Sequence, residues 1–158
     1  MKWIIFVVLT IVCWGAYVPV LHQGQSLLSR DGPAPLRAFM FVGLAYFLVS
    51  GLVLLYLAAS RAEPLLVTAG GGAVSTAAGI LGAVGALGVV FALKFGKPTL
   101  GVRAPLLIPP LVFAGAPIVN TVVSMLWHRP TKAPSLWFYL GIVMAAAGAA
   151  LVLRFKPT

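Results

Sequence analysis

Apolar residues dominate five stretches of the sequence that carry no Asp, Glu, Lys or Arg. These stretches are residues 3–29, 38–60, 64–93, 104–127 and 133–153. Each contains an apolar core of roughly 18–24 residues, the helix length that spans the ~30 Å hydrocarbon layer of a bilayer. The pattern predicts an all-α membrane protein, a bundle of five transmembrane helices over residues 3–21, 38–57, 73–93, 110–127 and 136–153.

Short connections rich in Pro and Gly separate the predicted spans. Helix breaks are expected around Gly32, at Glu63 and Pro64 together with residues 70–72, at residues 96–98 and around Pro130. No connection is long enough to separate two folding units. We therefore expect a single membrane domain over residues 1–158.

Several prolines fall inside the apolar stretches. Those expected to break or bend a helix are Pro19, Pro109, Pro110 and Pro117. Proline lacks an N–H and pushes the residue before it away from helical geometry. We therefore expect the fourth helix to begin at Pro110, with residues 104–108 extended or re-entrant, and to kink at Pro117. The breaks either line a polar path or reflect the frequency of proline in membrane helices.

The basic residues predict an orientation. Eleven Lys and Arg against two acidic residues give a formal charge of +9, and because they flank the apolar segments, lipid headgroups rather than nucleic acid are the expected partner. One side of the predicted topology carries Lys2, Arg61, Arg129 and Lys132, and the other carries Arg30, Arg37, Lys94, Lys97, Arg103, Arg154 and Lys156. This asymmetry predicts an integral plasma (inner) membrane protein with the C-terminus inside; a dual orientation is the alternative.

Catalytic chemistry has little support in the sequence. The two acidic residues, Asp31 and Glu63, fall in predicted loops, so no carboxylate is available for acid–base work inside a span. His22 and His128 stand alone at span ends, and His22 is interpreted as a solvated end residue. With Cys13 as the only cysteine, we predict no enzyme activity, no metal site and no cofactor.

Small residues recur at helical spacing on two spans. They are Gly79, Gly82 and Gly85 on the third, and Gly141, Ala145 and Ala149 on the fifth. Small residues let membrane helices approach closely. The sequence leaves open whether these faces pack within the chain or between two subunits.

Neutral polar and aromatic residues at membrane depth are the candidate substrate-binding groups. Trp14 and Tyr17 share one face of the first span with Thr10 and Cys13, and Phe113, Pro117, Asn120 and Ser124 share one face of the fourth. We predict binding roles for Trp14, Tyr17, Asn120 and Ser124. The alternatives are interfacial anchoring for the two aromatics and an interhelical hydrogen bond for Asn120, whose amide is costly in hydrocarbon unless it is paired.

Four segments have a recognisable order along the chain: 13–19 (CWGAYVP), the Gly-rich span ending at Lys94, 116–120 (APIVN) and the final span with Gly141 and Gly148. Together they resemble the drug/metabolite transporter superfamily, EamA-like branch. The resemblance covers nearly the whole chain as one five-helix unit, whereas family members usually contain two such units. It implies transport, although His128 stands where the family often has an acidic residue.

The leading functional hypothesis is a half-size transporter for a small neutral or anionic metabolite. A homodimer, or a heterodimer with a similar five-helix chain, would supply the missing repeat, since transporters place their sites between repeats. Transport is expected not to be proton-coupled through an embedded carboxylate. The alternative is a non-transporting membrane subunit, assembly factor or lipid-binding interaction protein.

Overall fold

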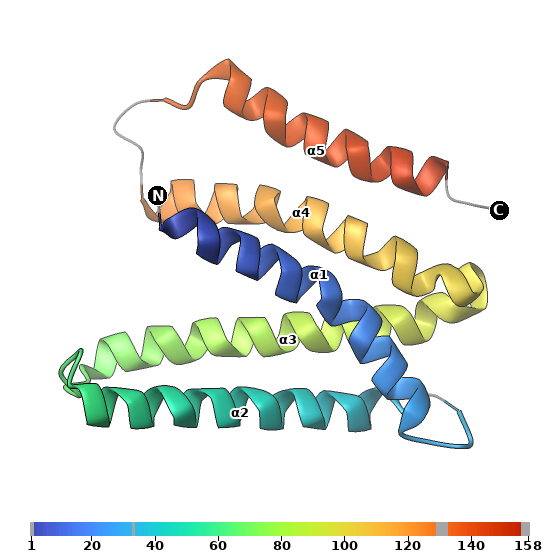
Figure 1. The fold of residues 1–158 in the computed structure, drawn as a ribbon. Coiled ribbons are helices and arrows are strands. Elements are labelled where there is room, and N and C mark those ends of the chain that lie inside the picture. Colours follow the sequence, from blue (N-terminus) through green and yellow to red (C-terminus); the bar gives the residue numbers. More distant parts are fainter. Residues whose placement is uncertain (1, 33, 129–132, 156–158) are drawn as a thin grey trace. The chain divides into compact units, whose positions relative to one another are not determined.

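The computed structural model describes residues 2–32, 34–128 and 133–155, and within them the fold is all-helical, with no strand (Figure 1). The elements follow in the order α1 (Trp3–Leu27), α2 (Pro35–Ser60), α3 (Ala69–Leu100), the 3₁₀ turn η1 (Gly101–Arg103), α4 (Ala104–Trp127) and α5 (Leu136–Arg154).

The third and fourth helices join through η1 without a non-helical gap. The described chain therefore contains four continuous helical stretches long and apolar enough to cross a membrane: Trp3–Leu27, Pro35–Ser60, Ala69–Trp127 and Leu136–Arg154. The sequence had predicted five separate ones. Gly101 has a φ of +60° between α3 and α4, a conformation that glycine adopts without steric cost. These long apolar helices indicate an integral membrane protein.

Helix α1 extends beyond its predicted end at residue 21, because Pro19 does not stop it. A proline inside a helix removes one backbone hydrogen bond, and the neighbouring turns can hold the rest. The Ser26 hydroxyl donates to the His22 carbonyl oxygen at 3.2 Å. The Ala34 amide donates to the Gln25 carbonyl oxygen at 2.8 Å, so the chain after α1 returns to its last turns.

The predicted breaks at residues 70–72 and 96–98 are wrong, because both segments are helical within α3. At the start of this helix Thr68 acts as a cap: its hydroxyl Oγ1 accepts from the Gly71 amide at 3.3 Å, and its carbonyl accepts from the Gly72 amide at 2.9 Å. Helix α2 begins at Pro35, where a missing N–H costs nothing. It ends at Arg61, whose φ is +50°.

The expected extended piece at residues 104–108 is also wrong, since α4 is helical from Ala104 and contains Pro109, Pro110 and Pro117. Pro105 occupies the first turn, the position that proline tolerates best, so it is Pro105 rather than Pro110 that opens the helix. The kink at Pro117 stays a prediction. Helix α5 agrees with its predicted bounds to within one residue, and the Ser135 side chain accepts from the Phe138 amide at its start.

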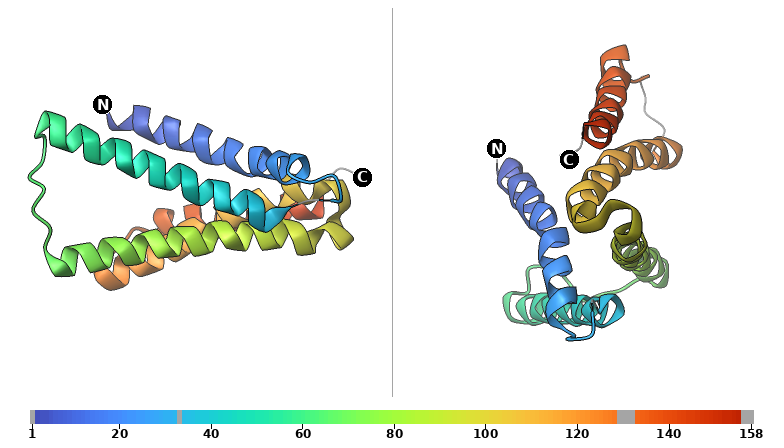
Figure 2. Two further views of the ribbon diagram at one scale, coloured as in Figure 1. Left: turned by 90° about the horizontal axis from the view of Figure 1, so that it is seen from below. Right: turned by 90° about the vertical axis from the view of Figure 1, so that its right-hand side faces the viewer.

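The chain divides into two compact units. Unit 1 takes in the chain up to Val18 and from Lys97 onward, and unit 2 is Pro19–Gly96. In unit 1, α4 and α5 pack against each other. In unit 2, α2 and α3 run antiparallel in both Figure 1 and the left view of Figure 2. The single domain over residues 1–158 stays a prediction.

Buried residues lie near particular helix ends. In unit 1 they are Val18, Ala104, Leu107 and Ile108; in unit 2 they are Leu21, Gln25, Ala34, Ala38, Val90 and Leu93. No residue of α5 is buried, and α2 contributes only Ala38. Most large apolar side chains of the described helices are exposed, as expected where hydrocarbon is the solvent.

Candidate functional site

An aromatic group in unit 1 connects α1 with α4. The ring centroids of Trp14 and Tyr17 lie 6.3 Å apart at 45°, and those of Trp14 and Phe113 lie 6.1 Å apart at 79°. The second pair is edge-to-face, an arrangement that aromatic quadrupoles favour. Trp14 therefore stands at the centre of a three-ring group, which we call the aromatic group.

Helical spacing accounts for two of the three rings. Trp14 and Tyr17 are three residues apart, so they share one face of α1, as predicted from the sequence. Phe113 comes from α4, one turn before Pro117. Trp14 is 50% exposed, whereas Tyr17 and Phe113 are half-buried. The indole is thus the most exposed ring of the group, and an exposed aromatic ring can stack against a ring or an apolar part of a ligand.

The other two predicted binding residues lie away from the aromatic group. Asn120 and Ser124 are seven and eleven residues after Phe113 on α4, which places them about 10 and 16 Å farther along the helix axis at 1.5 Å per residue. Both side chains are exposed on the single chain. The structure brings Trp14 and Tyr17 together, and it does not bring Asn120 or Ser124 to them.

Two polar residues of α1 within unit 2, the half-buried His22 and the buried Gln25, have side-chain atoms shielded from solvent. Gln25 is 2% exposed, and its Nε2 has no hydrogen-bond partner within the described residues; the same holds for the buried Nδ1 of His22. The sequence interpretation of His22 as a solvated end residue is wrong, because α1 continues to Leu27 and turns this nitrogen inward. The sequence-based candidates did not include Gln25, although a polar amide within an uncharged stretch could have indicated it.

Acidic and metal-binding groups are sparse. Asp31 and Glu63 lie in the segments that connect α1 to α2 and α2 to α3, and both are exposed. Within the described residues no group of three His, Cys, Asp or Glu side chains could hold a metal ion. The basic Lys94 places its Nζ 5.5 Å from the Phe95 ring centroid, and Phe95 stacks on Phe91 at 5.9 Å.

The small-residue faces are open in the single chain. A Cβ added at Gly79, Gly82, Gly85 or Gly141 would meet no heavy atom within 4 Å beyond its own helix backbone, so no other helix of the same unit approaches these glycines closely. On α5, Gly141 and Ala145 are exposed and Ala149 is half-buried. The packing role of these residues, within the chain or between two subunits, stays a prediction.

Comparisons of the chain with protein-family models, with curated proteins and with solved structures gave no match. The resemblance to the drug/metabolite transporter superfamily therefore stays a prediction that depends on the residues quoted for it.

Proposed function

We propose that this chain is a half-size membrane transporter for a small neutral or anionic metabolite and that it acts as a dimer. The observation that carries the proposal is the aromatic group, which joins two proline-containing helices. Its half-exposed Trp14 on α1 contacts Phe113 on α4. Transporters commonly bind substrate where membrane helices are interrupted and backbone carbonyls lose their amide partners. In a helix the amide of residue i donates to the carbonyl of residue i−4, and proline has no amide hydrogen. Pro19 therefore leaves the carbonyl of Gly15, next to Trp14, without this donor, and Pro117 does the same to the carbonyl of Phe113 in the aromatic group.

The topology proposed with this function has five spans and the C-terminus inside. The continuous stretch Ala69–Trp127 has 59 residues, about 88 Å at 1.5 Å per residue, whereas one crossing needs about 30 Å. We therefore assign it two crossings, with η1 at the turn. Arg129, Lys132 and Lys156 of the charge count lie outside the described residues. Reporter fusions after Arg154 and within residues 61–68 would test the assignment.

Exposed surface supports the dimer. Helix α5 contacts α4 and has no buried residue, and its Gly141 has open space above it. Membrane helices associate through such small-residue faces. A second copy, or a similar five-helix chain, would cover them and supply the repeat that a solute path needs.

Proton coupling through an embedded carboxylate is not part of the proposal. Both carboxylates of the chain lie in exposed connecting segments, whereas proton relays in membranes use ionisable groups within the bundle. We expect flux in proteoliposomes to follow the substrate gradient and to ignore an imposed pH gradient at zero membrane potential. Uptake driven by the pH gradient and abolished in Asp31→Asn or Glu63→Gln would contradict this.

The experiment that tests the transporter combines binding and flux on the full chain. A thermal-shift screen with sugars, amino acids and nucleosides identifies a ligand, and uptake of that ligand into proteoliposomes is then measured. Trp14→Ala should abolish the shift and the uptake, Trp14→Phe should retain part of both, and Trp3→Ala, at the exposed start of the same helix, should change neither. If no solute in the screen shifts the unfolding temperature of the protein and none is taken up, the alternative of a non-transporting subunit, assembly factor or lipid-binding protein gains support.

A further inference from the structure

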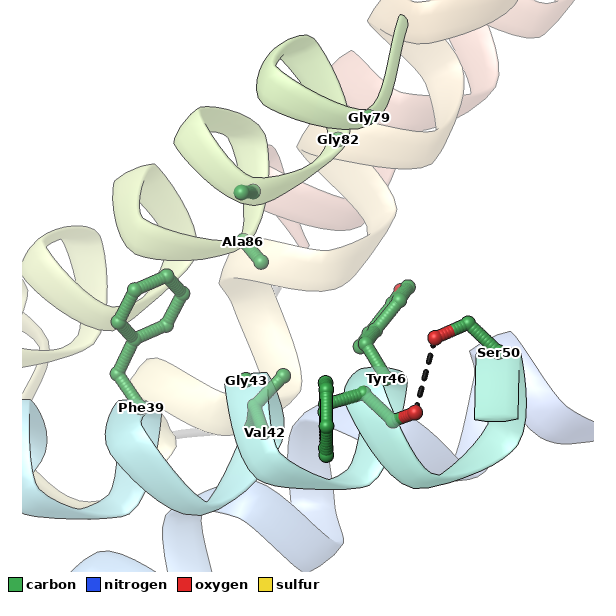
Figure 3. Close-up of a pocket in the computed structure, with 10 residues that line it drawn as sticks. Phe39, Val42, Gly43, Tyr46, Ser50, Gly79, Gly82 and Ala86 are labelled. Carbon is green, nitrogen blue, oxygen red and sulfur yellow. Dashed lines mark hydrogen bonds between the residues drawn. The ribbon is translucent and has the colours of Figure 1, made fainter. Parts of the chain in front are cut away.

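A groove lies between α2 and α3, entirely within unit 2 (Figure 3). Its volume is about 340 Å³. One wall carries Phe39, Tyr46 and Phe47 of α2, and the other carries Gly79, Gly82 and Ala86 of α3. Tyr46 and Phe47 are 64% and 73% exposed, so the groove is reached from outside the chain.

The lining is apolar and offers little polar recognition. Ser50 is the hydroxyl residue of the lining besides Tyr46, and its Oγ donates to the Phe47 carbonyl oxygen of its own helix at 2.8 Å. The α3 wall contributes only the methyl groups of its alanines and no polar side chain. All lining residues fall within the apolar stretches 38–60 and 64–93. The groove is therefore expected to lie at the level of the lipid hydrocarbon, where an apolar occupant is favoured.

Size separates two kinds of apolar occupant. A helix about 10–12 Å across takes up roughly 400–600 Å³ for a single turn of 5.4 Å. A second helix would lie across the mouth of a groove of about 340 Å³, whereas a slender, flexible hydrocarbon chain lies inside it. The shape therefore favours the hydrocarbon chain.

Charge separates the two ends of the groove. Because α2 and α3 are antiparallel, Phe39 and Ala86 lie toward the end where α2 begins and α3 approaches its C-terminus. In unit 2 this end carries the exposed Arg30, Arg37 and Lys94 against Asp31, while the other end carries Arg61 against Glu63. The first end is therefore net positive and the second neutral, which favours an anionic headgroup at the first.

We propose that the α2–α3 groove holds one acyl chain of an anionic phospholipid whose headgroup lies at the basic end near Arg37 and Lys94. The proposal does not depend on transport, since a transporter or a structural subunit could carry such a lipid. It assigns a lipid of defined charge to a surface that unit 2 by itself leaves open.

Photocrosslinking on the full-length protein tests the proposal. The protein is reconstituted in mixed vesicles of phosphatidylglycerol and phosphatidylcholine, with a diazirine in the acyl chain of one lipid at a time, and labelled peptides are mapped by mass spectrometry. Label is expected on residues 39–50 and 79–86, with phosphatidylglycerol labelling about fivefold more than phosphatidylcholine, the preference that one well-placed basic residue provides.

Two matched pairs of variants locate the lipid. Gly82→Leu fills the groove and should remove most of the label, while Gly85→Leu, on the same helix but outside the lining, should keep it; added Cβ atoms meet nothing at either position, so both should fold, which thermal unfolding checks. Lys94→Gln with Arg37→Gln should abolish the preference for phosphatidylglycerol, and Arg61→Gln at the other end should not.

Three results would overturn the proposal. These are equal labelling by the two lipids in the unchanged protein, equal labelling of the Gly82→Leu and Gly85→Leu variants, and labelling that appears only in a monomeric fraction. The last result would assign the groove to a contact between two copies of the chain.

Discussion

The two antiparallel helix pairs α4–α5 and α2–α3 differ in how their facing surfaces meet. On α4 the half-buried residues include Ala114, Ile118, Thr121 and Met125, and on α5 they are Ile142, Ala146, Ala149 and Leu153. Both sets follow i, i+4, i+7, i+11, so each marks one helix face, and these helices pack against each other. Between α2 and α3 there is instead a cavity of about 340 Å³.

The difference shows what small residues do and do not decide. On α5 the two alanines of this face lie between Ile142 and Leu153, so the α4 side chains find both space and contact. On α3 successive glycines provide space but no side chain, and the aromatic wall of α2 does not reach across. A stripe of small residues permits two helices to approach closely. Close packing also requires side chains on the facing helix that fill the space.

The largest expected effect is on assembly through the outer face of α5. Gly141 is exposed and open, so Gly141→Leu should weaken a dimer that uses this face by about tenfold or more, equal to ~1.4 kcal/mol. Val143→Leu, on another exposed side of the same helix, is the control. Dissociation measured in detergent and in bilayers distinguishes them. A monomeric mass for the unchanged chain in both settings would remove the dimer and weaken the transporter proposal.

The next effect concerns the inner face of α5. Ala146→Leu should destabilise the α4–α5 pair by about 1 kcal/mol, because added methylenes overfill a packed contact and Ala146 is only half-buried. Ala145→Leu, one residue earlier and exposed, should leave unfolding of the monomer nearly unchanged. Thermal unfolding of both variants in detergent measures the difference. Equal destabilisation would mean that the contact face is misassigned.

Unit 2 contains buried polar atoms without a hydrogen-bond partner within the described residues. Removing one of them should change the free energy of unfolding by a similar or smaller amount. Gln25→Leu should raise stability by about 1 kcal/mol, since a buried amide without a partner costs about 1–3 kcal/mol. Gln23, which is exposed two residues earlier, provides the control: Gln23→Leu should change stability by no more than about 0.5 kcal/mol. A loss of stability in Gln25→Leu would show that a bound group pairs with this amide.

The smallest expected effect is at the open glycines of α3. Gly82→Ala and Gly85→Ala should each stabilise the helix by about 0.5–1 kcal/mol, because glycine is entropically costly in a helix and the new Cβ has space. Hydrogen exchange of the α3 amides would register the gain. A marked loss at Gly82 alone would point to a tightly held occupant in the groove.

Helix existence was predictable from the sequence, while helix ends were less so. Residues 136–153 matched α5 because Ser135 is a cap that sequence displays directly. The start of α4 was misplaced because several prolines competed for the first turn, and only the fold shows that Pro105 takes it. Residues 70–72 entered α3 because glycine, a breaker in water, is tolerated in membrane helices.

The candidate site was predictable only where one helix supplies it. The spacing of Trp14 and Tyr17 places both rings on one face of α1. The contact of Trp14 with Phe113 joins residues far apart along the chain, and no local pattern encodes it. The burial of Gln25 likewise depends on the return of the chain at Ala34. The sequence around Gln25 and Gln23 therefore gave no reason to expect one to be buried and the other exposed.

Cys13, the only cysteine of the chain, is exposed on α1 immediately before Trp14. A nitroxide or fluorophore attached there would need no prior removal of other thiols. In a homodimer each subunit would then carry one probe at an equivalent position, so a pulsed electron-paramagnetic-resonance trace would contain a single inter-subunit distance beside the aromatic group. Broadening of that distance on adding a solute would report movement of α1 in the native sequence.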